Sequence, residues 1–437
     1  MEPGGSWRVR IVLAIVLLGA GAGAEEGDKP LDVGGSLRTV GLAARNYRSE
    51  AVFGTDNPSD AVSQTLLRLT ATGRPVPWLF YEVHGVENFD YSSAPEGGAG
   101  TGAFSLQAAG TRYRALREQW DQVREDDTSV RAWLDRASVK FSLGIADLTL
   151  GRQAINFSKA WFWNPLDVFL PFDARQFDRD YKPGMDAGRL DVALGQFSGL
   201  NAVGVAGRRS DPIRGGYADG AQALGGSWYA SAAMLRAFTA LAGWDLSAQG
   251  GKVYGGWQAG AGAAGETGPL SLRGEAAWFR ASGGGDEVQG RNGPVRLLDD
   301  SVSAVAGGGH RFANSLDLEA EYLYNGAGLP RDLAAAAFRV ASGDALHMGR
   351  HLTGVTATYE LTALLTGRFS GVASLSDHSF VLQPGFAWSV SNESEFQAGA
   401  MLNRGRRPST DEYGAPVPAS EFGSYPDWYY AEYKFHF

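Results

Sequence analysis

The stretch SLDLEAEYLY, residues 315–324, decides the fold class because it alternates between apolar and acidic side chains. One face carries Leu316, Leu318, Ala320, Tyr322 and Tyr324, and the other carries Asp317, Glu319 and Glu321. A period of two over this length is typical of a β-strand and unlike the 3.6-residue period of a helix. The stretch therefore predicts a strand with one apolar face and one face in water.

Two further segments repeat this pattern. Residues 270–278 place Leu270, Leu272, Ala276 and Trp278 opposite Ser271, Arg273 and Glu275. Residues 395–403 place Phe396, Ala398, Ala400 and Leu402 opposite Glu395, Gln397 and Asn403. A tilted strand needs about 9 to 11 residues to cross a bilayer, and each segment is about that long. Each ends at or near an aromatic residue, as expected for strands that cross membrane interfaces.

The connections between such segments alternate between short and long. We expect short ones at 144–147, 312–315, 360–363 and 391–394, and long ones at about 157–186, 208–225, 281–299, 326–349 and 405–426. Barrels of the outer membrane have short periplasmic turns and long external loops. The long connection at 326–349 also contains a possible short helix at 331–340.

The composition agrees with a barrel. The chain has 60 glycines in 437 residues, about twice the usual share of roughly 7%. Aromatic residues reach 11%, and a membrane barrel uses them in two interface girdles. Past the N-terminal segment no run of 18 apolar residues occurs, so any membrane span must be built from strands.

The N-terminus predicts a secretory signal peptide over residues 1–24. Arg8 and Arg10 precede an apolar run at 11–18, and small residues follow up to Ala24. For residues 25–437 we predict one domain, an all-β, single antiparallel transmembrane β-barrel of about 16 or 18 strands with long external loops. Residues 228–243 fit either two strands or a short helix, and the first hundred residues are equally ambiguous.

The C-terminal strand suggests how the chain would assemble. Tyr429, Ala431, Tyr433, Phe435 and Phe437 share one face, and Glu432, Lys434 and His436 share the other. This ending resembles the C-terminal signature of bacterial outer-membrane barrels, which the barrel assembly machinery reads. The resemblance implies that Tyr433, Phe435 and Phe437 form an assembly signal. The alternative is an edge strand of a secreted β-sandwich, whose apolar faces a second sheet would have to cover.

Residues 139–186 add a second resemblance. The strand LTLGRQ, the aromatic stretch after it, the motif NPLD at 164–167 and a charged segment are similar to porin-like barrels that include alginate-export-type channels. That resemblance implies that loop 157–186 folds into the lumen and narrows it. Its charged candidates to face a solute are Arg175, Asp178, Arg179, Asp180 and Lys182. The alternative is an external loop whose aromatic side chains bury one another.

Alternation assigns further charges to the lumen. The pore-lining candidates on strands are Arg189, Arg273, Glu275, Asp317, Glu319, Glu321 and Arg368. Basic residues are mostly arginine, which favours an anion-selective pore, whereas the acidic residues favour the mixed field of a general porin. Arg152 breaks the alternation, and we expect a bulge near Gly151, or a position at the membrane edge, to keep it away from lipid.

Other function classes have little support. The net charge of −9 and the lack of a basic block argue against nucleic acid as a partner. No phosphate-loop, dinucleotide or zinc motif is present, so we predict no cofactor and no bound metal. The six histidines are scattered and are expected to be solvated, although His351 and His378 are the residues a barrel hydrolase would use.

The sequence thus predicts a porin-like channel, integral to the bacterial outer membrane after Sec-type export. The channel would serve diffusion or export of hydrophilic solutes, with anions among them. Its predicted partners are outer-membrane lipid, the barrel assembly machinery and the small solutes themselves. A surface adhesin or scaffold without an open pore, and an outer-membrane barrel hydrolase, are the alternatives. Solute identity, direction of transport and oligomeric state are left open.

Overall fold

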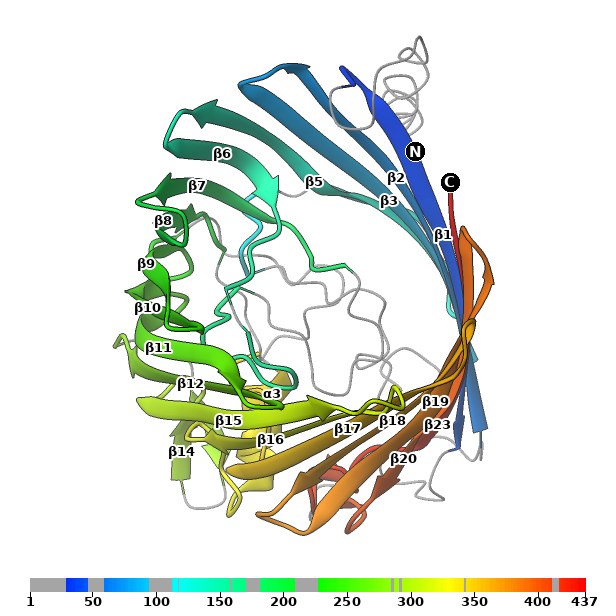
Figure 1. Cartoon of the computed structure of the whole chain (residues 1–437). Helices are drawn as coiled ribbons and strands as arrows, with labels where there is room; N and C mark the ends of the chain where they lie inside the picture. The colour runs from blue at the N-terminus through cyan, green and yellow to red at the C-terminus, as the bar shows by residue number, and fades with distance from the viewer. Residues whose placement is uncertain are drawn as a thin grey trace, which may run out of the picture.

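The chain folds into one closed antiparallel β-barrel (Figure 1). The computed structural model describes residues 29–45, 59–93, 112–116, 118–157, 159–169, 181–208, 227–283, 287–290, 293–341, 343–410 and 416–437. The wall contains 18 strands among these residues, each paired with its neighbour in the ladder, and β1 pairs with β23 to close the ring. The strand number matches the larger of the two predicted values.

The wall strands are β1 (Asp32–Arg45), β2 (Ser59–Val76), β3 (Leu79–Ser92), β5 (Thr128–Leu143), β6 (Ala146–Gln153), β7 (Met185–Ala193), β8 (Ser198–Val205), β9 (Ala232–Leu241), β10 (Trp244–Val253), β11 (Gly256–Thr267), β12 (Leu270–Ala281), β15 (Ser301–Arg311), β16 (Asp317–Asn325), β17 (His351–Thr362), β18 (Leu365–Ser374), β19 (Ser379–Ser391), β20 (Ser394–Arg404) and β23 (Asp427–His436). Shorter elements accompany them: β4 (Gln119–Arg124), β13 (Glu287–Gly290), β14 (Gly293–Arg296), β21 (Ser409–Thr410), β22 (Pro416–Val417) and the helix α3 (Leu333–Ala341).

Short turns join the strands at one end of the barrel. The start of β1 and the end of β23, the two strands that close the ring, lie at the same end. There Gly35 and Phe437 exchange backbone hydrogen bonds of 2.8 and 3.0 Å. The aromatic ring of Phe437 lies so close to Gly35 that a Cβ on this residue would come within 2.6 Å of it. The terminal aromatic residue therefore packs on the first strand and helps to close the ring.

The outer face of the barrel is apolar. Large hydrophobic side chains exposed on this face include Leu37, Val83, Leu150, Leu235, Leu272, Val302, Leu318 and Val355. Aromatic side chains form two groups: Phe89, Trp257, Trp278, Tyr322 and Tyr429 near the long-loop end, and Trp78, Trp388, Tyr433 and Phe435 near the short-turn end. An apolar band between two aromatic girdles is what a bilayer requires of a spanning barrel. Within the described residues, no helix is long and apolar enough to cross a membrane.

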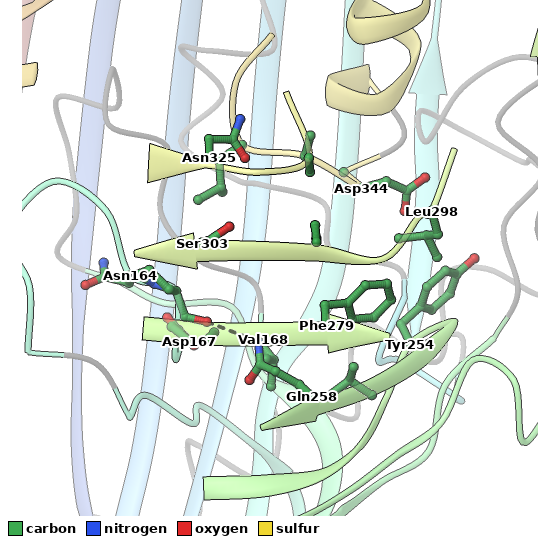
Figure 2. Close-up of a pocket in the computed structure, with 18 of the residues that line it drawn as sticks. Asn164, Asp167, Val168, Tyr254, Gln258, Phe279, Leu298, Ser303, Asn325 and Asp344 are labelled. Carbon is green, nitrogen blue, oxygen red and sulfur yellow. Dashed lines mark hydrogen bonds between the residues drawn. The ribbon is translucent and has the colours of Figure 1, made fainter. Parts of the chain in front are cut away.

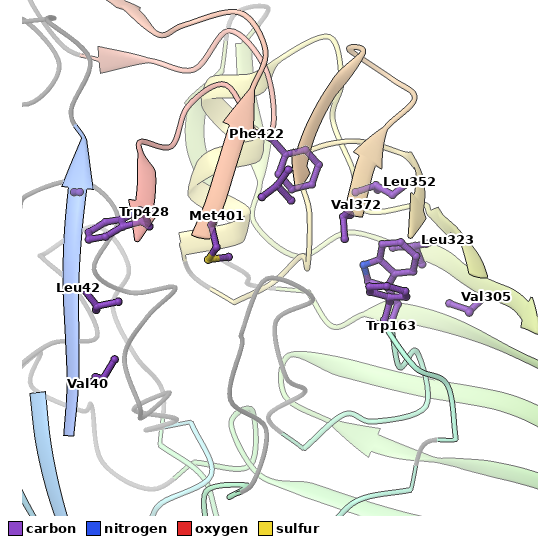
Figure 3. Packing of buried hydrophobic residues seen from close by; sticks show 13 residues of the cluster. Val40, Leu42, Trp163, Val305, Leu323, Leu352, Val372, Met401, Phe422 and Trp428 are labelled. Carbon is purple, nitrogen blue, oxygen red and sulfur yellow. The ribbon is translucent and has the colours of Figure 1, made fainter. Parts of the chain in front are cut away.

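The inner face is mixed. Near the long-loop end, inward side chains of β1, β15 to β20 and β23 form a hydrophobic cluster with two residues of the chain that follows β6 (Figure 3). Figure 3 shows Trp163 beside Leu323 and Val372, with Phe422 of the last long connection nearby. The cluster joins the wall to chain that lies inside it.

Several local predictions can now be compared with the structure. The strands predicted at 270–278, 315–324 and 395–403 correspond to β12, β16 and β20, and the predicted helix corresponds to α3. The ambiguous segment 228–243 contains a single strand, β9. The predicted signal peptide, residues 1–24, lies outside the described residues.

Candidate functional site

The chain leaves the wall after β6 and enters the barrel. We call residues 154–157 and 159–169 the inner loop. Figure 1 shows this chain crossing the space that the strands enclose. Beyond the end of β6, the strand β4 takes its place beside β5. The β4–β5 pairing runs from Gln119↔Trp133 to Arg124↔Ser129. The β4 segment therefore fills the wall where β6 ends, and this allows the inner loop to turn inward without leaving an unpaired edge against lipid.

Two glutamates of the wall hold the backbone of the inner loop. Glu321, on β16, accepts hydrogen bonds from the amides of Trp161 at 2.5 Å and Phe162 at 2.7 Å. Glu275, on β12, accepts from the amides of Lys159 at 2.8 Å and Leu166 at 3.3 Å. A carboxylate that accepts from backbone N–H groups forms a charge-assisted bond, which is stronger than a neutral one. These two side chains thus fix the path of the loop.

The wall is shaped to receive the loop. The ring of Phe162 lies over Gly354, where a Cβ would come within about 2.9 Å of it. Leu166 lies over Gly260 and Gly262, at 2.6 and 3.0 Å from the corresponding Cβ positions. Glycine at these three strand positions gives the room that the two loop side chains occupy. The sidechain amides of Gln249 and Gln258 donate to the carbonyls of Leu166 and Pro165.

A buried polar chain links the inner loop to the external connections. Trp163 donates its indole Nε1–H to Nε2 of His347 at 2.7 Å. Nδ1 of His347 lies 2.9 Å from Oε1 of Glu421, and the other oxygen of Glu421 accepts from the amide of Gly349 at 2.6 Å. His347 is 2% exposed. Three segments far apart in sequence therefore meet at one imidazole ring.

The loop returns toward the wall through a second buried pair. Lys182 donates to the carboxylate of Asp167, and both side chains are almost fully buried. Burial raises the pKa of Asp167 and lowers the pKa of Lys182. Each group therefore depends on the other to remain charged, and the pair joins the inner loop to the residues just before β7.

The opposite wall carries arginines in ion pairs. Arg38 of β1 donates to Glu432 of β23 at 2.8 Å, and both side chains are buried. Arg68 of β2 donates to Asp135 at 2.7 Å, and Asp135 lies at a bulge of β5 opposite His84 and Gly85. A bulge of this kind turns an extra side chain inward.

Arg189 and Arg236 form a third group on β7 to β9. Arg189 donates to Asp191 at 2.8 Å. Arg236 donates to Asn201 at 3.2 Å, and its guanidinium lies 5.2 Å from the centre of the Phe157 ring. The root of the inner loop therefore packs against basic side chains of the wall.

The most open charges lie toward the short-turn end. Arg368 faces inward on β18, is exposed, and has one nitrogen 3.4 Å from Oε1 of Gln397. It lines a polar cavity of about 330 Å³ together with Lys434 and His436. Glu393 and Glu395 lie on the same cavity wall. This end of the lumen carries charges of both signs.

A second cavity, of about 190 Å³, lies between the inner loop, the wall and the external connections (Figure 2). Phe279 and Leu298 form part of its apolar wall. Its polar wall is already engaged, because Arg112 pairs with Asp344 and Asn325 donates to the carbonyls of His347 and Gly349 at 2.9 Å. We therefore attribute this cavity to the packing of the loop.

The structure places the predicted pore residues in different settings. Arg189, Arg273, Asp317, Glu319 and Arg368 lie on the inner face, whereas Glu275 and Glu321 face inward but are occupied by the loop. Lys182 was expected to face a solute but is buried against Asp167. Arg175, Asp178, Arg179 and Asp180 lie outside the described residues.

Two expectations about individual residues had different outcomes. Arg152 is kept away from lipid as expected, because it is buried and donates to Asp186 at 2.7 Å. Gly151 before it has a φ of +113°, but the pairing of β6 with β5 and β7 runs through Gly151 without a shift, so the expected bulge is not found there. The histidines were expected to be solvated, but His84 and His347 are buried, so this prediction was wrong for both.

Sequence reasoning missed the most elaborate contacts of the interior. Arg38, Arg68, Asp135, Glu432 and His347 were not proposed as pore or loop residues. Arg38 and Glu432 lie 394 residues apart, so no local pattern connects them. For the four strand residues an inward position was the only signal available, and His347 lies in a long connection that has no such pattern.

The hydrolase alternative gains no support from the histidine contacts. Both ring nitrogens of His347 are engaged, and His351 contacts the hydroxyl of Tyr322 at 2.6 Å. Ser379 donates to Asp377 at 2.6 Å without a histidine in the contact. In the part of the chain that the structure describes, no group of three or more histidine, aspartate or glutamate side chains is placed to hold a metal ion.

Known structures with the same architecture were found. OccAB2 of Acinetobacter baumannii matches with a TM-score of 0.56 and 9% sequence identity, covering 93% of this chain and 98% of that one. OccAB4 of the same organism matches with a TM-score of 0.55 and 8% identity, covering 95% and 100%. OpdK of Pseudomonas aeruginosa, solved with vanillate, matches with a TM-score of 0.50 and 12% identity, covering 93% and 98%. The likeness extends over nearly the whole of each chain and concerns the fold.

In sequence, no protein-family model matches the chain, and no curated protein is significantly similar to it.

Proposed function

We propose that this protein is a porin-like channel of the bacterial outer membrane, through which small hydrophilic solutes pass. The inner loop forms its constriction. The observation that carries the proposal is a closed barrel with an apolar outer face, whose lumen contains a loop fixed by wall carboxylates. A scaffold barrel has no need of a loop held so specifically in its interior.

Membrane insertion follows from the two faces of the wall. The apolar band and aromatic groups on the outside match a bilayer, whereas ion pairs such as Arg38–Glu432 line the inside. We infer an integral location in outer-membrane lipid, reached after export. The ring-closing contact of Phe437 with β1 supports its predicted role in assembly, with the assembly machinery as partner.

We further propose that anions are among the solutes. The inner loop covers Glu275 and Glu321, because its backbone amides donate to both carboxylates and Arg273 also pairs with Glu321, so neither is presented to a solute. Arg368 stays open to the lumen. Among the structures of similar fold, OpdK was solved with vanillate, an organic anion.

The resemblance of residues 139–186 to alginate-export-type channels suggests a narrower proposal, in which the solute is an oligomeric acid. A long polyanion would need a continuous line of cations along the lumen. The inward arginines of β1, β2, β7 and β18 would provide it if solute binding displaced the carboxylate partners of the first three.

A planar bilayer with a salt gradient tests the proposed function. The purified chain should give discrete conductance steps, and the reversal potential should have the sign of anion preference. A folded barrel that never conducts would contradict the proposal and favour an adhesin or scaffold. Steps with cation preference would retain the channel and overturn the anion proposal.

A further inference from the structure

We propose that His347 is the positioning residue of the constriction and that it holds the inner loop only while its imidazole is neutral. The inference rests on the proposed channel function, because it names the residue that regulates the same loop. The evidence for it is the set of contacts that the imidazole ring makes.

The hydrogen bonds of His347 fix its tautomer. The indole Nε1–H of Trp163 can only donate, so Nε2 of His347 must carry a lone pair to accept it at 2.7 Å. Nδ1 must then carry the proton, which points at Oε1 of Glu421, 2.9 Å away. The neutral ring therefore bridges a donor on the loop and an acceptor on the external connection, and the imidazolium ion cannot do so.

Protonation of Nε2 would place two donors face to face. The ring would keep its contact with Glu421, now as an ion pair, while the indole of Trp163 would lose its acceptor inside a hydrophobic cluster. A buried donor without an acceptor is costly, so the loop would have to move. Acid is therefore the trigger that the contacts of the ring predict.

The charged groups around the ring come from several segments. Glu421 contacts it directly, and Asp377 of the β18–β19 turn accepts from the amide of Glu421 at 2.6 Å. The connection that carries His347 also contains Arg331, Arg339 and Arg350. Arg339 donates to the carbonyls of Arg296 and Ala327, and Arg350, directly before β17, donates to the carbonyl of Gly328 at 3.2 Å.

Charges on the inner loop itself have partners of their own. Lys159 pairs with Asp245 at 2.6 Å and Asp167 with Lys182. Of the groups on the loop, Trp163 is the one that the ring of His347 engages by a hydrogen bond. Releasing that bond leaves the Glu321 and Glu275 contacts in place, so we expect the part of the loop around Trp163 to loosen while the loop stays inside the barrel.

Single-channel recording at about pH 7.5 and about pH 5 tests the proposal. In the wild type, loss of one buried hydrogen bond should raise the fraction of time in a wider, noisier state about tenfold at the lower pH. His347→Gln places an uncharged carbonyl near Trp163, so it should keep the narrow state at both pH values. His347→Ala should show the wide state at both. His310→Gln, near the end of β15 and away from the inner loop, should behave as the wild type.

Other results would overturn the proposal. A wild type with the same conductance and noise at both pH values would do so, as would a His347→Gln variant that retains the acid response. A chain that never conducts would instead refute the channel function. In that case the NMR signal of the indole N–H of Trp163, identified by its absence in Trp163→Phe, still tests the role of His347. This signal should shift between the two pH values in the wild type and should not shift in His347→Gln.

Discussion

Replacing Glu321 by glutamine should loosen the constriction. Glu321 accepts the amides of Trp161 and Phe162 on its two oxygens, at 2.5 and 2.7 Å, and its side chain is fully buried. Glutamine keeps one acceptor and replaces the other by an NH2 group, which would face a backbone N–H. One charge-assisted bond is lost and one buried donor is left without an acceptor. The free energy that favours the bound position of the loop over a displaced one should therefore fall by about 3 kcal/mol.

That free energy corresponds to a shift of about two orders of magnitude between the seated and displaced loop. Single-channel recording should show it as added open-channel noise and a larger mean conductance. Glu319→Gln is the matched control, since Glu319 lies on the same strand and also pairs with Arg273 but does not contact the loop. If both variants gave the same traces, the effect would be one of pore charge, and the anchoring argument would be refuted.

Three further predictions test other parts of the interior. Gly354→Ala places a methyl group against the ring of Phe162 and should displace the loop, raising the conductance, whereas Gly41→Ala, with open space around it, should not. Glu432→Gln breaks the buried pair with Arg38 across the ring-closing strands and should lower the free energy of unfolding in urea by about 3 to 5 kcal/mol. Glu395→Gln, at a half-exposed pair with Lys434, should change that quantity by less than about 1 kcal/mol; equal losses would show that the closing pair has no special role. Arg368→Gln should move the reversal potential toward cation preference, and Arg311→Gln, at an exposed turn, should leave it unchanged; an unaltered potential in Arg368→Gln would remove this residue from the ion path.

The sequence predicts those strands well in which large apolar side chains alternate with charges. β12, β16, β20 and β23 have this pattern, and their inward and outward faces are as expected. β11 does not, because its centre, AGAAG at 261–265, offers small side chains that mark neither face. Barrel closure and strand number depend on pairing around the whole ring, which a local pattern does not contain.

The candidate site could be predicted only in part, for a related reason. Alternation correctly predicts that Glu275 and Glu321 face inward. The backbone N–H groups that donate to their carboxylates, however, belong to a loop more than 100 residues earlier in the chain. Lys182 looks like a solvated charge because its partner, Asp167, lies 15 residues away in the sequence, outside any local pattern. His347 lies in a long connection without any motif, and only the assembled barrel brings Trp163 and Glu421 to its ring.

The central claim, that solute passes through the lumen, can be tested directly because the chain contains no cysteine. Arg368→Cys would place a single thiol on the inner face, and Phe369→Cys would place one on the outer face of the same strand. A charged, water-soluble thiol reagent added during bilayer recording should reduce the current stepwise in Arg368→Cys and leave it unchanged in Phe369→Cys. Unchanged current in both variants, with the reaction of Arg368→Cys verified by mass, would contradict the account.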